Sequence, residues 1–442
     1  MINRFCSRIL LFTACGVLGN LIISNAQSDT IKIMSYNTLN YDIFDKTCPT
    51  NVNSLKNKYL REIIRYVQPD IVGLVKMNQD PPFLNDSIPS FVLDSACNGC
   101  WGHGVLTDYS GYSKANMIYF KTSKFGLYRT KTIYAADGAI SDINMHQLYY
   151  KDSSLARTHD TIFLNIILVH DLSGGSNASQ RAAEIGGAMA WLSANVKTPG
   201  NYIFMGDFNV TSSGEGCFQA MLNPSNPYVK FNEPTGLSGN WSSNPSQVSN
   251  YITQSTRTAT LPDCGSSGGL TDWFDHIMCS DFIMKGTDAF TYLPGSFTVI
   301  AQDGNHTKKA LTDGPVNTSA PSNIVHDVYN MSNHMPISLK LALNPLHRAS
   351  GIADQFNNKP TDEVTCRYFN NNLNFSTLDE SLMGKNCSLV VYDCLGKIVF
   401  ISQVSIGNNT EPVNISFLPK GAYIISLTSG NQSICRDKLM KY

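Results

Sequence analysis

A short apolar run that ends in a glycine, a carboxylate and an amide constrains the fold of this chain most strongly. Residues 202–205 are Tyr-Ile-Phe-Met, and Gly206, Asp207, Phe208 and Asn209 follow. A run this short is typical of a buried strand, and alternation along it places Asp207 and Asn209 on one side. That pair suits the activation of water and the binding of an oxyanion such as phosphate. The same residue types also form ordinary turns, so the rest of the chain must decide.

Size and charge favour several domains and no general affinity for polyanions. The chain has 442 residues, which predicts two or three domains. Its formal net charge is −1, and 42% of its residues are hydrophobic, so a sizeable core is available. This charge balance excludes a global attraction to nucleic acid, although a local basic groove stays open as an alternative.

The first residues have the pattern of a secretory signal peptide. Arg4 and Arg8 give a positive start, residues 9–24 are largely apolar, and small residues precede a junction between Ala26 and Gln27. This pattern predicts a signal peptide at residues 1–26. A membrane anchor is the alternative, but glycines interrupt a stretch already short for a span.

Cysteine usage agrees with export. Two of the twelve cysteines lie in the signal segment, so six remain before residue 280 and four after residue 365. Even numbers in an oxidising compartment favour disulfides, and the connectivity is open. Cys97, Cys100 and His103 could also be half of a zinc site, but no second pair at matching spacing follows, so disulfides are preferred.

Strand and helix patterns are mixed as far as residue 343, which predicts an α+β fold of two packed mixed sheets with flanking helices. The expected strands cover 31–37, 71–75, 117–120, 162–169, 202–205, 275–278 and 335–339, and the expected helices cover 54–67 and 180–196. This first domain would span 27–344. Turn residues predict a linker at 345–365, and short strands at regular spacing predict a small β-sandwich at 366–442.

Several polar residues fall at the ends of these expected strands. They are Asn37, His170, Asp207, Asn209, Asp275, His276 and His334. Each has an ordinary structural interpretation alone, but two sheets that end at one rim would gather them in a cleft.

The ordered series resembles the endonuclease/exonuclease/phosphatase superfamily over residues 29–343. The matching segments are Tyr36-Asn37, the strand at 69–76, Val169-His170, the Gly-Asp-Phe-Asn step at 206–209, Phe-Asp-His-Ile at 274–277 and Ser-Asn-His-Met-Pro at 332–336. The segments at 180–184, 253–257 and 268–272 are similar to those of secreted bacterial members. The resemblance implies a DNase I-like four-layer α/β-sandwich.

The resemblance also implies a role for each site residue in phosphodiester hydrolysis. Asp207 would activate or orient water, Asn209 would hold the phosphate, His170 and His334 would stabilise developing charge, Asp275 would support them, and Asn37 would lie beside a metal ion. The metal would be Mg²⁺ or Mn²⁺, held weakly by Asn37 and Asp207. A monomer is expected, and its ligand would be a phosphodiester of nucleic acid, a lipid head group or a small molecule.

Two residues depart from the family pattern. Lys76 stands where the family has a metal-binding acidic residue, and Asn333 stands where it has the aspartate of Ser-Asp-His. Mg²⁺ prefers carboxylates and water. Two positive unit charges about 4 Å apart repel by about 4 kcal/mol at an effective dielectric near 20. An ammonium at position 76 would therefore weaken metal binding by about a thousandfold.

Two functions follow from these departures. The first is an exported phosphodiesterase or nuclease with impaired activity, in which the metal site is weak or holds no metal because of Lys76. The second is a non-catalytic surface protein that binds phosphate-containing ligands or a protein partner, in which Lys76 attracts phosphate directly.

The C-terminal segment resembles the sorting domain of the type IX secretion system of Bacteroidetes. The matching pieces lie at 391–396, 418–423 and 438–441. The resemblance implies export through the periplasm by that machinery to the cell surface or the medium. Cleavage of this domain and its use in surface attachment both stay open.

The signal pattern gives a direct prediction. We expect the mature chain to begin at Gln27, because the small residues before it suit signal peptidase. Mass spectrometry of the exported protein should find no peptide that spans residues 20–30. Intact protein in the cytoplasm as the main species would contradict this prediction.

Overall fold

The structure, a computed structural model, forms two compact units, Met1–His347 and Arg348–Tyr442. It describes residues 29–41, 48–51, 54–93, 99–111, 114–136, 139–152, 155, 161–343, 364–369, 371–377, 382–394, 397–406, 411–429 and 432–441. The predicted signal peptide and most of the predicted linker lie outside the described residues. Each unit is described by itself.

The first sheet of the first unit is built around β1 (Thr30–Tyr41). Its strand order is β11 (Phe290–Tyr292), β13 (Ile337–Leu343), β1, β2 (Ile71–Asn78), β4 (Lys114–Lys121) and β3 (Trp101–His103), and β12 (Thr298–Val299) also pairs with β13. β1 runs parallel to β2 and antiparallel to β13. Because both faces of these strands are covered, they are buried almost throughout.

The second sheet brings three strands that carry site residues side by side. Its order is β5 (Phe125–Tyr134), β6 (Ile143–Tyr150), β7 (Phe163–His170), β8 (Asn201–Asp207), β10 (Asp275–Ser280) and β9 (Phe231–Asn232). β7 and β8 are parallel, and β8 and β10 are antiparallel. This register places His170 opposite Asp207, and Asp207 opposite Asp275.

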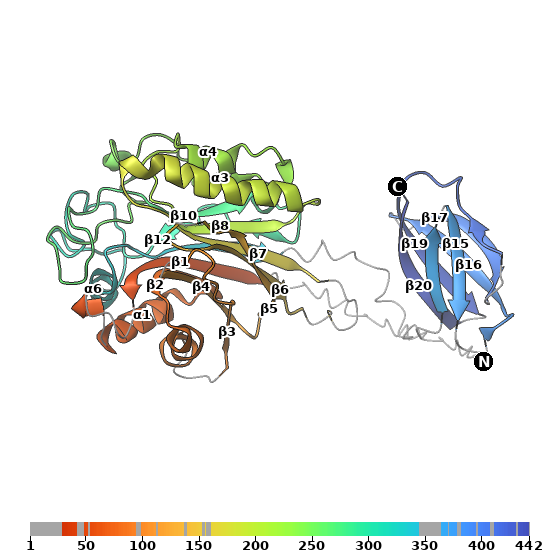
Figure 1. Ribbon diagram of the computed structural model, residues 1–442. Coiled ribbons are helices and arrows are strands. Elements are labelled where there is room, and N and C mark those ends of the chain that lie inside the picture. The colour runs from red at the N-terminus through yellow and green to blue at the C-terminus, as the bar shows by residue number, and fades with distance from the viewer. Residues whose placement is uncertain are drawn as a thin grey trace, which may run out of the picture. The chain divides into compact units, whose positions relative to one another are not determined.

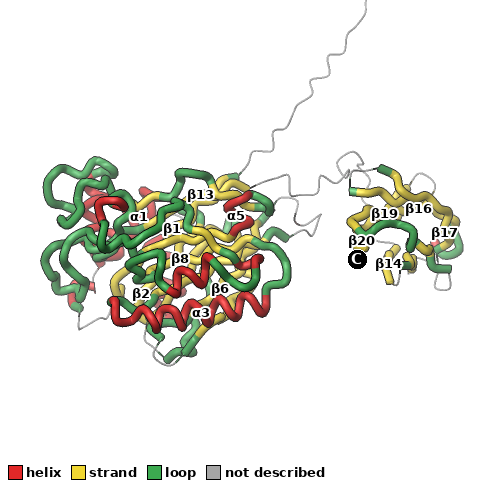
Figure 2. The backbone as a smooth tube through the Cα atoms, turned by 90° about the horizontal axis from the view of Figure 1, so that it is seen from above, coloured by secondary structure: helices red, strands yellow, loops and turns green. Residues whose placement is uncertain are grey.

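The two sheets pack face to face between two layers of helices (Figure 1). Gly73 of β2 lies so close to Leu168 and Met205 of the second sheet that a Cβ there would meet both side chains. Helices α3 (Ala178–Asn195) and α4 (Gly216–Leu222) cover the second sheet (Figure 1 and Figure 2). Helices α1 (Ser54–Val67) and α6 (Ser322–Met331) lie on the side of the first sheet.

This arrangement confirms the predicted four-layer α/β-sandwich. The helix at 54–67 has the predicted bounds, whereas the β5–β6 hairpin was not predicted because its mixed residues lack a clear alternation. The remaining short elements are η1 (Pro49–Asn51), the π-helical η2 (Phe83–Leu93), η3 (Gly175–Asn177), η4 (Pro227–Val229), η5 (Pro245–Val248) and α5 (Asp281–Lys285).

The second unit is a pair of small antiparallel sheets around one apolar core. The sheets have the orders β14 (Val364–Phe369), β15 (Asn372–Thr377), β18 (Val413–Asn414) and β17 (Ile398–Ser405), β16 (Asn386–Asp393), β19 (Gly421–Ser429), β20 (Gln432–Lys441). Core residues such as Phe375 and Leu427 come from both sheets. The first strand begins at Val364, two residues before the predicted start of this domain.

The disulfide prediction is correct for part of the chain only. Cys48 is bonded to Cys264, and Cys100 is also disulfide-bonded, which makes the zinc alternative wrong. Free thiols among the described residues include Cys217, Cys279, Cys366, Cys387 and Cys394. Cys217 and Cys279 are completely buried, and they serve as small apolar side chains of the core.

The backbone at the end of β8, just before Asp207, requires a glycine. Gly206 has φ 141°, and a Cβ there would collide with the backbone carbonyl of Val169 on the neighbouring strand. We expect Gly206→Ala to lower the free energy of unfolding by about 3 kcal/mol, measured by urea denaturation.

Gly186→Ala is the matched control for this substitution. Gly186 lies inside α3 with open space where an added methyl group would project, so alanine there should stabilise the protein by up to about 1 kcal/mol. Equal effects of the two substitutions would show that the strand end does not need glycine.

Candidate functional site

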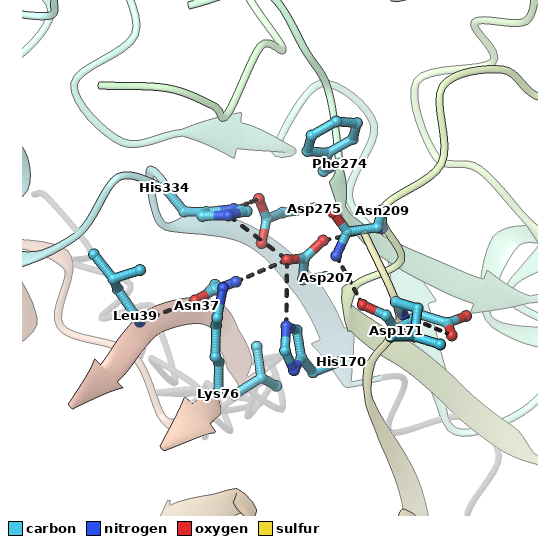
Figure 3. Close-up of polar contacts among 12 residues, drawn as sticks. Asn37, Leu39, Lys76, His170, Asp171, Asp207, Asn209, Phe274, Asp275 and His334 are labelled. Carbon is cyan, nitrogen blue, oxygen red and sulfur yellow. Dashed lines mark hydrogen bonds and ion pairs between the residues drawn. The ribbon is translucent and has the colours of Figure 1, made fainter. Parts of the chain in front are cut away.

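The rim where β7, β8 and β10 meet gathers most of the predicted site residues. The cross-strand register aligns His170, Asp207 and Asp275 on adjacent strands. Asn37 comes from β1 of the other sheet, and His334 comes from the segment before β13. All five side chains are buried, so they form a compact polar cluster between the ends of the two sheets (Figure 3).

The Asp207 carboxylate is the centre of this cluster. Its Oδ2 accepts a hydrogen bond from Asn37 Nδ2 at 2.7 Å and lies 3.6 Å from His334 Nε2 and 4.0 Å from His170 Nε2. Its Oδ1 accepts the backbone N–H of Asn209 at 3.0 Å. The pKa of Asp207 is raised to about 6 overall. Burial is the largest cause and the charge of Asp275 adds to it, whereas the charges of His334 and Lys76 lower the pKa.

Asp275 orients His334. Its Oδ2 lies 2.7 Å from His334 Nδ1, and its Oδ1 is buried without a partner among the described groups. The Oγ of Ser332 accepts the N–H of His334 at 3.1 Å and donates to the carbonyl of Asn37 at 2.7 Å. The histidine is therefore fixed from both sides, which directs its Nε2 toward Asp207.

Asn333 does not share in this orientation. Its Nδ2 donates to Ser266 Oγ at 2.7 Å, and its Oδ1 has no partner among the described groups. Asp275, and not residue 333, holds the ring of His334, with Oδ2 at 2.7 Å from its Nδ1.

Lys76 projects into the cluster from a bulge in β2. The pairing of β2 with β4 shifts between Leu74 and Met77, and Lys76 itself has φ 58°. Its side chain extends toward Asn37 and the Asp207 carboxylate (Figure 3). Burial lowers the pKa of Lys76, and the negative charges of Asp207 and Asp275 act in the opposite direction. The ammonium is thus directed at the Asp207 carboxylate from the β2 bulge (Figure 3).

His170 is a neutral imidazole in this environment. Burial lowers its pKa well below the ordinary range, and the positive charge of Lys76 lowers it further. Its Nδ1 is buried and has no partner among the described groups. An imidazole that stays neutral exchanges protons poorly at neutral pH, so its contribution is a single polarised N–H or lone pair.

Two residues that sequence reasoning did not assign also belong to the site. Gln254 Nε2 lies 2.5 Å from His334 Nε2, and the Asp171 carbonyl accepts Asn209 Nδ2 at 2.9 Å. The segment at 253–257 had been singled out as family-like, which was the available signal for Gln254. Asp171 directly follows His170, but nothing in its local pattern distinguishes it.

His276 is not part of the site, although it was grouped with the other strand-end residues. It lies in a cluster of aromatic rings with Trp241 and Trp273, and its Nε2 contacts the Trp273 carbonyl at 3.2 Å. Burial lowers its pKa to about 3. Strand alternation explains the difference, because Asp275 and His276 point to opposite faces of the sheet.

The residues at the rim do not fit a tightly held Mg²⁺ or Mn²⁺ ion. Ligand atoms of Asp207, Asp275 and His334 lie within 4.8 Å of one another. However, Asp275 Oδ2 pairs with His334, and the Oδ1 of Asn37 accepts the N–H of Leu39 at 3.0 Å. The carboxylates of Asp207 and Asp275 and the ammonium of Lys76 together carry a charge of only −1. Hard divalent cations need more free oxygen ligands than this.

Comparison with known proteins identifies the C-terminal segment. Residues 369–441 match the family model described as a secretion system C-terminal sorting domain. The predicted sorting domain is confirmed, and the protein is exported to the cell surface or the medium. None of the described helices has the length and apolarity that a bilayer span requires.

Solved structures similar to this chain include proteins of the fold class predicted above. An endonuclease/exonuclease/phosphatase from Bacteroides vulgatus has 11% identity and a TM-score of 0.44, and covers 72% of this chain and 100% of its own. The human Nocturnin catalytic domain has 11% identity and a TM-score of 0.42, with coverages of 72% and 97%. Truncated Caenorhabditis elegans TDP2 has 14% identity and a TM-score of 0.42, with coverages of 71% and 98%. No curated protein sequence matches the chain. The chemistry of the site therefore rests on this chain's own residues.

The raised pKa of Asp207 gives a prediction about stability. The folded pKa of about 6 exceeds the ordinary value of 3.8, so the folded chain holds this proton more tightly than the unfolded chain. The resulting stability is complete below pH 3.8 and is lost as the pH rises through about 6. We expect Asp207→Asn to raise the free energy of unfolding at pH 7 by up to about 3 kcal/mol, with little effect at pH 4.

Urea denaturation at pH 4 and pH 7 tests this expectation. Asp86→Asn is the control, because Asp86 is exposed and should leave the pH dependence unchanged. If the Asp207→Asn variant and the natural chain lose stability in parallel between these pH values, Asp207 is not the source of the pH dependence.

Proposed function

We propose that the first unit is an exported phosphate-ester-binding protein of the endonuclease/exonuclease/phosphatase type, with impaired hydrolysis of phosphodiesters. The observation that carries this proposal is the Lys76 ammonium directed at the Asp207 carboxylate from the β2 bulge (Figure 3). A fixed cation in a buried cluster attracts an oxyanion and repels a divalent metal ion.

The charges of the rim do not oppose the binding of a phosphate ester. Lys76 and Lys114 both act electrostatically on His170, and Asp207 and Asp275 carry the opposing charges. These four groups sum to zero, so a phosphate monoester or diester does not meet a negative field. Protonation of Asp207 below pH about 6 adds a hydrogen-bond donor and removes a charge, so binding should strengthen as the pH falls.

The residues that remain can position an ester but stabilise its transition state only in part. Lys76 would pair with a phosphoryl oxygen. His334, whose Nδ1 is held by Asp275 at 2.7 Å, would donate to a second one from Nε2 as the imidazolium, in place of the contact of Nε2 with Gln254. Asp207 would orient the attacking water through an oxygen that Asn37 already fixes at 2.7 Å. One ammonium stands in place of a carboxylate and the divalent ion that it would hold. The phosphoryl oxygens then face a single positive charge and no Lewis acid, which is why hydrolysis should be slow.

A metal-dependent phosphodiesterase is the second candidate. The unpaired Asp275 Oδ1 favours it, because a buried carboxylate oxygen without a partner is suited to a cation or a water ligand. In that case Lys76 would have to turn away from the cluster before the ion binds.

Substitution of Lys76 separates the two candidates. In the mature full-length protein we expect weak Mg²⁺ binding by calorimetry, detectable phosphate binding, and little hydrolysis of bis(p-nitrophenyl) phosphate. Lys76→Glu should tighten Mg²⁺ binding by at least about a hundredfold, because it adds a ligand and removes a repulsion of about a thousandfold. Hydrolysis with Mg²⁺ should appear in the same variant.

Lys76→Met and Asn333→Asp are the controls. Methionine removes the charge without adding a ligand, so it should weaken phosphate binding and gain no metal. Asn333→Asp alone should change Mg²⁺ affinity little, because this side chain contacts Ser266. A natural protein that binds Mg²⁺ tightly and hydrolyses diesters as fast as Lys76→Glu would exclude our proposal and establish the metal-dependent enzyme.

A further inference from the structure

An open cavity of about 620 Å³ lies at the edge of the second sheet. It is lined by the loop at 105–109 and by the end of β5, residues 130–135. Its volume is within the range of pockets that hold small organic ligands. Two of the large apolar side chains that the described surface exposes, Val105 and Tyr109, line this cavity, and Tyr109 is 76% exposed.

A chain of hydrogen bonds connects this cavity with Lys76. The N–H of Lys76 faces Asn116 Oδ1 at 3.4 Å, and Asn116 Nδ2 donates to Ser141 Oγ at 2.8 Å. The next residue, Asp142, accepts three donors of the cavity loop: Thr107 Oγ1 at 2.6 Å and the N–H groups of Tyr109 and Ser110, both at 2.9 Å. The loop is therefore anchored to the same framework that positions Lys76.

The opposite wall of the cavity also continues toward the rim. Thr132 pairs across the sheet with Asn144, and Asn144 pairs with Leu168, two residues before His170. Tyr134 lies close enough to Glu184 and Asp171 for their charges to act on its hydroxyl, and Asp171 follows His170. Thr132 of the cavity wall is thus two strands away from β7, the strand that ends at His170 in the Asp207 rim.

The threonines of the wall offer methyl groups, because their hydroxyls are already engaged. Thr130 Oγ1 accepts the N–H of Val105 at 3.2 Å and contacts His146 Nδ1 at 3.0 Å, and Thr132 Oγ1 donates to Asn144 Oδ1 at 2.8 Å. Thr107 is held by Asp142 in the same way. The wall therefore presents methyl groups among polar groups, in similar shares, beside the exposed ring of Tyr109.

We infer that this cavity receives the flat ring of an aromatic phosphate ester, the class to which nucleotides belong, while the phosphate binds at the Asp207 rim. The inference rests on the proposed function and deepens it by naming the substrate class. Stacking on Tyr109 suits any flat ring, because every aromatic ring has a π-face. Lys131, an exposed cation on the same wall, complements the negative charge of such an ester.

Tyr109 is therefore a specificity-determining residue, and paired ligands test it. In the mature full-length protein, adenosine 5′-monophosphate should bind about tenfold more tightly than ribose 5-phosphate, which lacks the ring. Tyr109→Ala should abolish this difference and leave the affinity for ribose 5-phosphate unchanged. Tyr109→Phe should retain the difference, because it keeps the ring.

Tyr128→Ala is the matched control. Tyr128 is 61% exposed on β5, the strand that supplies the cavity wall, but its ring contacts Phe163 outside the cavity. The preference for the ring-bearing ligand should therefore persist. Melting temperatures of the variants show whether each one is folded. Lys76→Met should weaken the binding of both ligands together, which separates the phosphate contribution from that of the ring.

The outcomes distinguish the two levels of the proposal. If both ligands bind equally and Tyr109→Ala changes neither, the cavity does not receive the ring, and the phosphate-binding function stands. If neither ligand nor inorganic phosphate binds, the proposed function fails and this inference fails with it. If Tyr109→Ala weakens both ligands equally, the residue supports the rim rather than the ring, which also overturns the assignment.

Discussion

The buried Asp207 carboxylate is the constraint on which the rest of the site depends. A carboxylate that is only 1% exposed is costly unless donors surround it, and this cost appears as a pKa raised to about 6. Asn37 from the other sheet and the backbone N–H of Asn209, in the turn that follows β8, supply these donors. The strand end, the turn and the contact between the sheets are therefore parts of one arrangement.

Lys76 changes the chemistry of this arrangement without changing its framework. The strand register, the His334–Asp275 pair and the contacts of Asp207 form this framework, and Lys76 adds a positive charge to it at the β2 bulge. Lysine at this position is compatible with the fold because the bulge already directs the residue into the cluster. Function can therefore diverge through one side chain while the surrounding packing stays intact.

The same framework extends beyond the rim. Asn116, Ser141 and Asp142 join the bulge to the loop that carries Tyr109, so the proposed phosphate site and the cavity are held by one set of buried hydrogen bonds. Export adds a second requirement, since a protein with a C-terminal sorting domain meets ligands outside the cell. A disulfide between Cys48 and Cys264 suits that environment.

The amino-acid sequence alone determined the main elements, their order and most of the rim. Hydrophobic periodicity is a local property, so α1, β2, β7 and β8 could be predicted, and most of the expected strands carried a polar site residue at or next to one end. The departure at Lys76 was predicted from the resemblance to the superfamily and not from periodicity. The β5–β6 hairpin has no such periodicity, and its absence from the prediction also concealed the cavity.

Only the tertiary structure decided which polar groups meet. Asn37 and Asp207 are 170 residues apart, and Asp275 and His334 are 59 apart, so their hydrogen bonds depend on strand order and register. The same is true of His276, which faces an aromatic cluster, and of Asn333, which contacts Ser266. Side-chain direction at a strand end reverses with each residue, and a bulge such as that at Lys76 shifts it again. Pairing between distant strands therefore decides what a strand-end residue can do.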